Sequence, residues 1–465
     1  MTLAVVGGGW AGLAAAVRAT QAGAKVTLFE MAGHLGGRAR GVDVGTLSLD
    51  NGQHILIGAY SRTLDLMRSV GVDPEQLLWR QPLELRYPDG RGLRLPLGHP
   101  VLAFVRAVAA CKGWTWRDRS SLLTAAGHWA AAGFTCDPRL TVAELCKKLT
   151  PPVRALLIDP LCVAALNTPA AEASASVLLT VLRDALFSGR GSADMLLPRR
   201  PLDALLPHPA HAWLQARGVP IHFSHRVQKL SPVPAPGTGW KVDNKAFDQL
   251  VLACPAAEAA RLVAPLEGSF PGAVAWAAQA QSLRYEPIIT VYVQCHGARL
   301  PAPLMALQEG PQAPAQFVLD HGALGSNKGV FGFVVSGAQP WVDAGLPATA
   351  AAVLAQARSA FSPGTWPTAP TLLRVLSEKR ATFRCTPALD RPGLAVGPGL
   401  WAAGDYVRGP YPATLEGAVR SAEAAVTAAV TAAVTAALTV AADLASGLTA
   451  GLPAAAIAGS PVPPG

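Results

Sequence analysis

The sequence predicts an α/β protein in which a dinucleotide-binding Rossmann unit is joined to a second, largely helical region. Three observations predict this fold class. The chain opens with an apolar strand pattern, a glycine-rich turn and a helical pattern. Several helical patterns, separated by prolines, lie between residues 120 and 215. Strand patterns then return and continue to residue 404, so the helical region is an insertion into an α/β chain.

The opening turn has the glycine spacing of a dinucleotide-binding fingerprint. Gly7 permits the tight turn, Gly9 lets the backbone approach a pyrophosphate, and Gly12 lets strand and helix pack closely. The helix expected over residues 13–21 would direct its N-terminal N–H groups at the phosphates. A second strand pattern ends at Glu30, whose carboxylate would accept the ribose hydroxyls and disfavours a 2′-phosphate. The segment therefore predicts binding of an ADP moiety.

Composition argues against several classes of function. The 465-residue chain has 15% charged residues and a net charge of +9, and it has no Lys/Arg run with interleaved aromatic residues that would indicate nucleic-acid binding. An anionic membrane surface and a general bias towards arginine explain the positive charge equally well. Seven isolated cysteines without a CxxC pair indicate neither a metal site nor a disulfide framework. We expect a cytoplasmic protein, because residues 424–442 are mostly Ala and Thr and too weakly apolar to span a membrane.

Two further segments near the N-terminus predict contacts with a cofactor. Gly36, Gly37 and Arg38 follow the second strand, where a close backbone and a guanidinium suit a pyrophosphate. Residues 50–54 end at His54, and their distance from the fingerprint is typical of flavoproteins in which a loop lies beside the isoalloxazine. Two alternatives stay open, a surface salt bridge for Arg38 and a satisfied core histidine for His54.

The middle of the chain predicts a separate, mainly helical region. We expect a helix over residues 61–78, a hairpin over 83–95 and an apolar helix over 102–110. Trp114 and Trp116 follow with flanking cations. Such a segment is typical of contact with a membrane interface, although an ordinary buried helix with a basic end has the same composition. Further helices are predicted over residues 121–132, 141–149, 153–167 and 173–187.

The last segment with predicted chemistry lies between residues 404 and 415. A strand pattern ends at Gly404 and Asp405, and Ala413, Thr414 and Leu415 lead into a new helix. Asp405 can accept a hydroxyl, such as those of a ribitol chain, while the helix N-terminus faces a flavin ring. These features favour FAD as the dinucleotide. The residues after 422 are Ala-rich and predict a helical extension of low complexity without chemistry of its own.

With these motifs in view, the chain resembles the FAD-dependent amine oxidase and phytoene desaturase superfamily, and within it the hydroxysqualene dehydroxylase subfamily. The resemblance covers residues 1 to about 422. The segment Arg408-Gly409-Pro410 is looser than the usual pattern. The resemblance is carried by GGGWAGLAAA (7–16), LGGRAR (35–40), DNGQHILIGAY (50–60), PLCVAALNTP (160–169), EKRATFRCTP (378–387) and GDYVRGPYPATLEGAVRS (404–421).

The resemblance implies FAD as the cofactor and a discontinuous two-domain fold. A glutathione-reductase-like FAD-binding Rossmann domain would combine residues 1–78, 215–272 and 372–422. A discontinuous α+β, largely helical substrate domain would combine residues 79–214 and 273–371. Residues 423–465 would form an Ala-rich, low-complexity tail.

The resemblance also implies a set of cofactor-binding residues. The ADP half would lie on Gly7, Gly9, Gly12 and Glu30. The rest of FAD would be held by Gly37 and Arg38 at the pyrophosphate, Val227 at the adenine through its backbone, Gly404 and Asp405 on the ribitol side, and Ala413, Thr414 and Leu415 under the isoalloxazine.

The implied reaction is the reductive removal of an allylic hydroxyl from a C30 isoprenoid, which gives squalene and water. Reduced flavin would give the hydride, and a positioned acid would protonate the departing hydroxide. His54 is the first candidate for this acid and Tyr411 the second. The substrate would be collected at the inner membrane face through the segment of Trp114 and Trp116, and no electron donor is identifiable. An oxidative carotenoid desaturase or amine oxidase of the same fold and a non-catalytic FAD-binding lipid carrier stay as alternatives.

Overall fold

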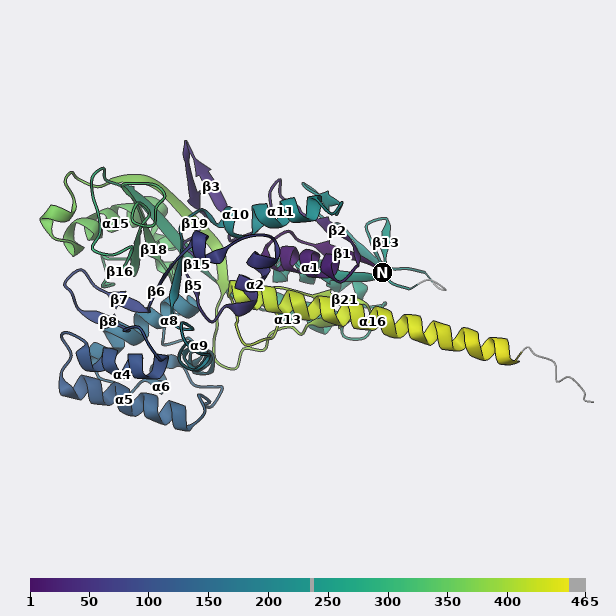
Figure 1. Cartoon of the computed structure of the whole chain (residues 1–465), viewed down its shortest axis with the longest axis horizontal. Coiled ribbons are helices and arrows are strands. Elements are labelled where there is room, and N and C mark those ends of the chain that lie inside the picture. Colours follow the sequence, from purple (N-terminus) through teal and green to yellow (C-terminus); the bar gives the residue numbers. More distant parts are fainter. Residues whose placement is uncertain (235–237, 451–465) are drawn as a thin grey trace, which may run out of the picture.

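The computed structural model describes residues 1–234 and 238–450, which form two sheet-containing regions and a helical region (Figure 1). The parallel sheet and α1 (Trp10–Gln21) lie at one side of the molecule. The antiparallel sheet and the inserted helices lie at the other side, and α16 (Leu415–Ala450) extends away from them. The structure is therefore the predicted mixed α/β fold with a parallel, Rossmann-type sheet.

The parallel sheet is built around the opening strand. Its order is β10-β2-β1-β14-β21-β20, and all pairings are parallel except β20 with β21. β1 pairs with β2 on one side and β14 on the other, and the central strands are buried, as expected for near-continuous apolar runs with helices on the sheet faces. The strands are β1 (Thr2–Val6), β2 (Lys25–Phe29), β10 (Ile221–His222), β14 (Gln249–Leu252), β20 (Ala395–Gly397) and β21 (Leu400–Ala402).

The second large sheet is antiparallel and has the order β16-β17-β18-β15-β19. Side chains alternate between its two faces: Val318 and Phe333 pack with α15, whereas Phe317 and Leu319 pack towards the inserted helices. A helix layer therefore covers each face. The elements are β15 (Tyr285–Gln294), β16 (Leu304–Ala306), β17 (Phe317–Asp320), β18 (Val330–Val335), β19 (Thr371–Phe383), α14 (Gln339–Ala344) and α15 (Leu346–Ala360).

The inserted helices confirm the predicted helical region but shift several of its bounds. The pattern predicted over residues 141–149 contains only the short helix α6, and the pattern over 153–167 begins with a π-helical turn (Arg154–Ile158). Trp114 belongs to the buried core of the inserted helices, whereas Trp116, the first residue of α5, is exposed. The helices are α4 (Pro100–Ala110), α5 (Trp116–Ala131), α6 (Val142–Leu145), α7 (Pro151–Val153), α8 (Asp159–Leu166) and α9 (Ala175–Phe187).

The continuous helix predicted over residues 61–78 is wrong. Gly71 has a φ of +87°, and this left-handed residue separates α2 (Ser61–Ser69) from α3 (Pro74–Leu77), after which the chain enters β6 (Leu78–Gln81). The hairpin predicted next is present. The remaining elements are β3 (Gly41–Val44), β4 (Leu47–Asp50), β5 (Leu56–Ile57), β7 (Glu84–Arg86), β8 (Gly92–Arg94), β9 (Met195–Pro198), α10 (Leu202–Leu205), α11 (Pro207–Gln215), β11 (Leu230–Pro232), β12 (Trp240–Val242), β13 (Lys245–Phe247), α12 (Ala256–Val263) and α13 (Ala273–Gln281).

The division into two domains stays a prediction, and we propose two adjustments to its boundaries. The predicted boundary at residue 372 falls at the start of β19, which pairs with β15 along its length, so we place the boundary after Phe383. The helices α10 and α11 share a core with α1, so we assign residues 202–214 to the FAD domain. Both adjustments follow the rule that a domain has its own hydrophobic core.

The C-terminal helix α16 combines an anchored first part with an exposed second part. Its first turns share a core with α1 and α2. Within the described residues it is the one helix long and apolar enough to cross a membrane, over Leu415–Thr439, with a mean hydropathy of 1.5 and 22% of the most apolar window buried. Val434 and Leu438 are exposed. The predicted tail is thus helical to residue 450, and its residues 451–465 lie outside the described part of the chain.

Candidate active site

The glycine turn joins β1 to α1 with little room for side chains. Gly7 has a φ of +109°, and a Cβ at this position would lie 2.7 Å from the carbonyl oxygen of Ala253. A Cβ at Gly12 would lie 1.7 Å from the carbonyl oxygen of Gly7. Gly9 differs, because a Cβ there would meet only the Cα of Gly37, at 3.9 Å. Gly7 and Gly12 thus fix the turn, whereas Gly9 borders open space beside the N-terminus of α1.

Glu30 lies at the end of β2, next to the glycine turn. Its carboxylate accepts hydrogen bonds from the N–H of Gly8 at 2.5 Å and from the N–H of Ala32 at 2.7 Å. The side chain is buried, so its orientation is fixed by these two backbone groups. A carboxylate retains acceptor capacity beyond two bonds, which leaves Glu30 able to accept further hydroxyl groups.

Arg38 connects the N-terminal segment to the C-terminal one. Gly36 donates its N–H to the carbonyl of Gly8 at 2.9 Å, which brings this loop beside the turn. The Arg38 guanidinium donates to Oδ1 of Asp405 at 2.7 Å and to the carbonyl of Ala381 at 2.8 Å. Burial alone would lower the pKa of Arg38, but the adjacent Asp405 carboxylate outweighs it and the pKa is raised. Arg38 does form a salt bridge, and its partner is itself a predicted cofactor residue.

The segment from Gly404 to Leu415 folds back on itself at the start of α16. The carbonyl of Asp405 accepts the N–H of Ala413 at 3.1 Å, and Ala413 has a φ of +58°. The Thr414 hydroxyl accepts the N–H of Gly417 at 3.0 Å and caps the helix. The N–H of Gly404 donates to the Ser421 hydroxyl at 2.9 Å. The predicted residues of this segment therefore meet at one helix N-terminus, beside Arg38.

Val227, the residue predicted at the adenine, lies between β10 and β11. It is buried, and its carbonyl accepts a hydrogen bond at 2.5 Å from the guanidinium of Arg261 on α12. The backbone at this position is therefore held in place from the neighbouring helix.

The residues around the glycine turn fit FAD. Gly9 and Gly37 let two backbones come into contact, and the N-terminus of α1 beside them has no side-chain cap, so its amides are free to bind an anion. Glu30 is bonded to the turn at Gly8, and Arg38, bonded to Asp405, follows Gly37. A carboxylate for hydroxyl groups and a helix N-terminus with a guanidinium for the pyrophosphate are the donors and acceptors that this dinucleotide needs.

His54 lies close enough to Arg38 to be influenced by its charge. Its Nδ1 is 2.9 Å from the carbonyl oxygen of Gly52. Burial lowers the pKa of His54; the hydrogen bond to Gly52 opposes this effect, and the charge of Arg38 adds to it. The imidazole is therefore neutral at neutral pH and becomes cationic only below its ordinary range.

Tyr411 is bonded to the inserted helices, an arrangement that the sequence did not predict. Its hydroxyl donates to Oδ2 of Asp184 on α9 at 2.5 Å. The ring packs edge-on to Tyr60 with centroids 6.3 Å apart and lies 4.8 Å from the Arg420 guanidinium. Burial raises the pKa of Tyr411 to about 12, and the hydrogen bond to Asp184 adds to the rise.

A buried polar cluster in contact with residues 50–54 was also not predicted from the sequence. The Tyr292 hydroxyl donates to the carbonyl of Asp50 at 2.8 Å and accepts from the Gln53 amide at 2.7 Å. His321 packs against Tyr292, and its Nε2 is buried without a hydrogen-bond partner among the described residues. Tyr292 and His321 lie in or beside strands of the antiparallel sheet, far along the chain, so only the Asp50 and Gln53 half of the cluster belonged to a recognisable motif.

Asp50 provides a pH-dependent prediction. Burial raises its pKa from 3.8 to about 7, the N–H of Leu202 opposes this rise, and Asp203 adds to it. The folded protein therefore keeps a proton that the unfolded chain releases above pH 3.8, so the free energy of unfolding should fall as pH rises from about 4 to about 7. The full change corresponds to roughly 4 kcal/mol. Asp50→Asn keeps the acceptor for Leu202 and should flatten this decline.

Urea unfolding of the FAD-loaded protein at several pH values measures the effect of Asp50→Asn. The matched control is Asp43→Asn, because Asp43 is exposed in the neighbouring strand β3. Asp43→Asn should keep the pH profile of the unsubstituted protein. Identical profiles for the unsubstituted protein and Asp50→Asn would contradict the assignment of the buried proton.

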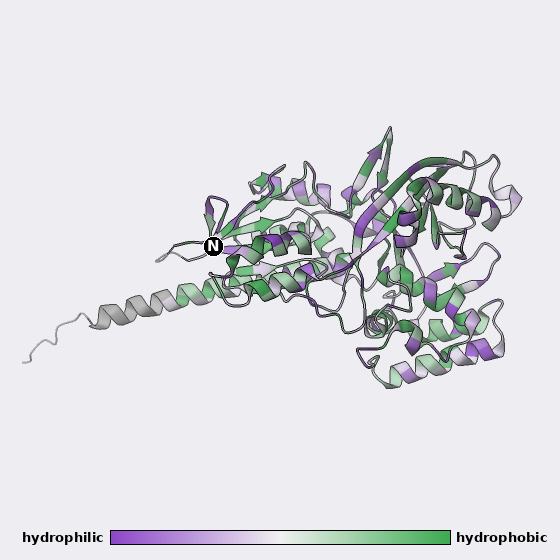
Figure 2. Cartoon of the chain, turned by 180° about the vertical axis from the view of Figure 1, so that it is seen from behind, coloured by the Kyte–Doolittle hydropathy of each residue, from purple (hydrophilic) through white to green (hydrophobic). Residues whose placement is uncertain are grey.

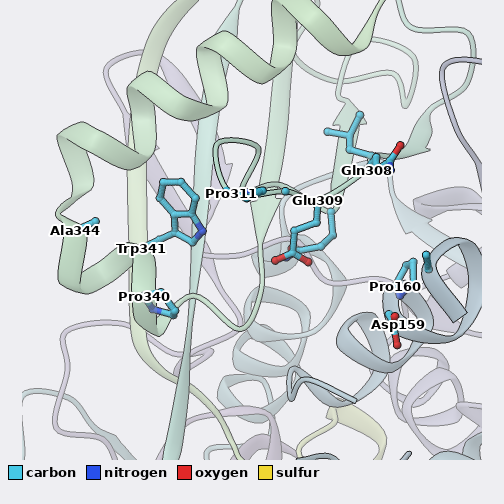
Figure 3. Close-up of a pocket in the computed structure, with 12 residues that line it drawn as sticks. Asp159, Pro160, Gln308, Glu309, Pro311, Pro340, Trp341 and Ala344 are labelled. Atoms are coloured by element: carbon cyan, nitrogen blue, oxygen red, sulfur yellow. The ribbon is translucent and has the colours of Figure 1, made fainter. Parts of the chain in front are cut away.

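A pocket of about 750 Å³ lies between α8, the β16–β17 connection and α14 (Figure 3). Asp159, Glu309 and Trp341 are among the residues that line it. Burial raises the pKa of both carboxyls, and the charge of Asp159 adds to the rise of the pKa of Glu309. The pocket lies in the predicted substrate domain and contains none of the predicted site residues.

Comparison with known proteins agrees with this geometry. The chain is 28% identical to a hydroxysqualene dehydroxylase from Rhodopseudomonas palustris, over 91% of this chain and 97% of that protein. It is 25% identical to the enzyme of the same name from Zymomonas mobilis, over 90% and 97%. A solved oxidoreductase structure from Methanosarcina mazei shares the fold, with a TM-score of 0.69 at 16% identity over 91% of this chain and 99% of that one.

The profile of one protein family covers most of the chain. It is described as flavin containing amine oxidoreductase, and it matches residues 10–430. The match begins at the first residue of α1 and includes the Arg38 loop and the start of α16, and the cofactor of the chain is FAD. The chain belongs to the family of flavin-containing amine oxidoreductases.

Proposed function

We propose that this enzyme removes the allylic hydroxyl of hydroxysqualene reductively and releases squalene and water. The observation that carries the proposal is the similarity to hydroxysqualene dehydroxylases over about nine-tenths of the chain and nearly the whole of each relative.

The geometry of the turn and of the α16 N-terminus supports the cofactor-binding residues that we propose. We assign Gly7, Gly9, Gly12 and Glu30 to the ADP half. The other contacts that we propose are Gly37 and Arg38 at the pyrophosphate, Val227 at the adenine, Gly404 and Asp405 at the ribitol, and Ala413, Thr414 and Leu415 under the isoalloxazine. The position of these residues at the N-terminus of α16 supports this last assignment, and Ala413 has the left-handed backbone that turns the chain into the helix.

In the reaction a C–O bond breaks and a C–H bond forms at the same carbon. Reduced FAD supplies two electrons as a hydride when it is bound. The chain must supply a proton to the departing hydroxide, so that water leaves, and it must exclude bulk water from the cation that remains.

His54 is the side chain that we propose as the proton donor. Its Nδ1 is bonded to Gly52, so protonation would place the transferable proton on Nε2. Because burial lowers the pKa of His54, the single-turnover rate should rise as pH falls below about 6.5. His54→Gln should lower this rate by roughly 10²- to 10⁴-fold and remove its increase at low pH.

Stopped-flow spectra of the pre-reduced enzyme measure this effect, with flavin content as a check of folding. The control is His208→Gln, since His208 is exposed on α11. His208→Gln should keep the rate and the pH profile. An undiminished rate in His54→Gln would mean that another group donates the proton to the departing hydroxide. Tyr411 is the second candidate, although Asp184 holds its proton and its pKa is about 12.

The direction of hydride transfer is tested by anaerobic spectroscopy. Reoxidation of pre-reduced flavin by hydroxysqualene would support the proposal. Bleaching of oxidised flavin by a carotenoid precursor or an amine would instead identify an oxidative enzyme. No spectral change with any of these compounds would identify an FAD-binding lipid carrier.

We also propose that the enzyme meets its substrate at a membrane surface. A C30 isoprenoid partitions into bilayers, because each buried CH₂ contributes about 0.8 kcal/mol. Of the two tryptophans predicted to contact the membrane, Trp116 is 81% exposed and available for this role, whereas Trp114 is 5% exposed and is not.

A further inference from the structure

Several large apolar side chains project into solvent near α4. Leu97 is 84% exposed, Leu102 60%, Val105 43% and Trp116 81%, and all four lie within twenty residues of one another. Leu102 and Val105 lie on the outward face of α4, whose inward face is formed by Ala103 and by residues 107 and 108. Figure 2 shows this end of the molecule, at its lower right, with hydrophobic and hydrophilic residues intermixed.

The exposed side chains are held by an ordered scaffold. Thr115 and Asp118 form a capping box that fixes the start of α5. The Asp118 carboxylate also accepts from the Thr150 hydroxyl at 2.6 Å, and these hydrogen bonds lower its pKa. Arg119 lies 5.6 Å from the Trp116 ring and donates to the carbonyl of Cys111 at 3.1 Å. Trp116 therefore projects from a fixed helix start.

Between residues 94 and 117 the charged side chains are all cations, and the first of them, Arg94, is paired with Glu84 of β7 at 3.8 Å. Arg94, Arg106, Lys112 and Arg117 are all exposed. The acid of this stretch, Asp118, is buried and already satisfied by Thr115 and Thr150. Apolar side chains surrounded by cations complement a bilayer that contains anionic lipids, where each cation contributes about 1 kcal/mol. The same charges disfavour a second copy of this chain as the partner, because a two-fold contact would bring like charges together.

A second pocket, of about 200 Å³, lies beside this surface. Leu97 and Ala103 are among its lining residues, together with residues 82–83, 190–191 and 193–194. The segment around residues 190–194 is hydrogen-bonded to the residues that follow His54. The N–H of Gly58 donates to the carbonyl of Asp194 at 2.9 Å, and the N–H of residue 59 donates to the carbonyl of residue 192 at 3.0 Å. The pocket thus lies between the exposed apolar surface and the segment that contains the proposed proton donor.

We propose that the α4 surface, defined as Leu97, Leu102, Val105 and Trp116 with the cations Arg94, Arg106, Lys112 and Arg117, docks on an anionic lipid bilayer. The pocket at Leu97 is then the place where an isoprenoid passes from the bilayer into the protein. The docking itself is independent of the reaction, whereas the passage of substrate rests on the proposed function.

Flotation of the FAD-loaded full chain with vesicles tests the docking. We expect binding to vesicles of phosphatidylglycerol and phosphatidylcholine, weaker binding to phosphatidylcholine alone, and release by salt. The triple variant Leu102→Ser, Val105→Ser, Trp116→Ala should bind roughly tenfold or more weakly. The control Met31→Ser, Val274→Ser, which removes exposed apolar side chains elsewhere, should bind as before.

Turnover separates docking from substrate passage. With hydroxysqualene in vesicles the triple variant should lose turnover, and in detergent it should retain it. Leu83→Arg, at a lining residue of the pocket outside the α4 surface, should keep vesicle binding but lose turnover of vesicle-embedded substrate, because a charge then stands in the pocket. Vesicle binding without turnover of hydroxysqualene in any form would support the surface and contradict the proposed function.

Three results would contradict docking through the α4 surface. They are absence of binding to anionic vesicles, equal binding of the triple variant, and loss of binding on deletion of residues 431–465 alone. The last result would assign the contact to α16. Self-association through α4 without vesicle binding would assign the surface to a second copy of the chain.

Discussion

Replacing Gly9 with Ala is expected to weaken FAD binding by roughly 10- to 100-fold while the fold stays intact. A Cβ at Gly9 meets only the Cα of Gly37, at 3.9 Å, and the residue has an ordinary φ of −73°. The new methyl group would therefore fill the space that we assign to the pyrophosphate and disturb nothing else. Flavin content after purification and titration of the apoprotein with FAD measure the effect.

Two neighbouring glycines serve as controls for Gly9→Ala. Gly12→Ala should disturb the fold itself, because its Cβ would lie 1.7 Å from the carbonyl oxygen of Gly7. Gly33→Ala should change neither folding nor FAD binding, since no atom lies within 4 Å of its Cβ. Full FAD affinity in Gly9→Ala would contradict the position of the pyrophosphate.

Replacing Glu416 with Ala is expected to destabilise the protein by about 3–5 kcal/mol. Glu416 is completely buried. Its carboxylate accepts from the N–H of Arg62 at 3.1 Å, the N–H and hydroxyl of Thr63 at 2.9 and 2.7 Å, and the Arg420 guanidinium at 2.7 Å. It therefore satisfies the N-terminus of α2 from α16, and the variant would leave these buried donors without an acceptor.

Urea unfolding measures the loss of stability in Glu416→Ala. Glu267→Ala is the control, because Glu267 is exposed and its loss should change the free energy of unfolding by no more than about 0.5 kcal/mol. If Glu416→Ala lowers the free energy of unfolding by less than about 1 kcal/mol, the hydrogen bonds of this carboxylate do not hold α2 against α16 as we propose.

The features that the sequence predicted best are those set by local geometry. The strand, glycine turn and helix at the N-terminus were predictable, because the positive φ of Gly7 and the contact of Gly12 with the turn require glycine at fixed spacing. The helix predicted over residues 61–78 failed for a related reason. A periodic apolar pattern continues across Gly71, whereas the backbone reverses there with a φ of +87°.

The contacts that the sequence could not predict join residues far apart in the chain. Arg38 and Asp405 are 367 positions apart, and Tyr411 and Asp184 are 227 apart. Each partner alone was consistent with a surface charge or a core residue, so only the fold decides between these alternatives. Trp114 and Trp116 show the same limit, because composition cannot tell which of two nearby side chains points into the core.

The most direct test of the central claim is to follow hydrogen from the flavin into the product. The enzyme is reduced anaerobically in D₂O, so that the exchangeable flavin N–H groups carry deuterium, and is then mixed with hydroxysqualene. The account predicts oxidation of the flavin together with squalene that carries one carbon-bound deuterium where the hydroxyl was. A flavin that stays reduced, or squalene without deuterium, would contradict hydride transfer from FAD to the allylic carbon.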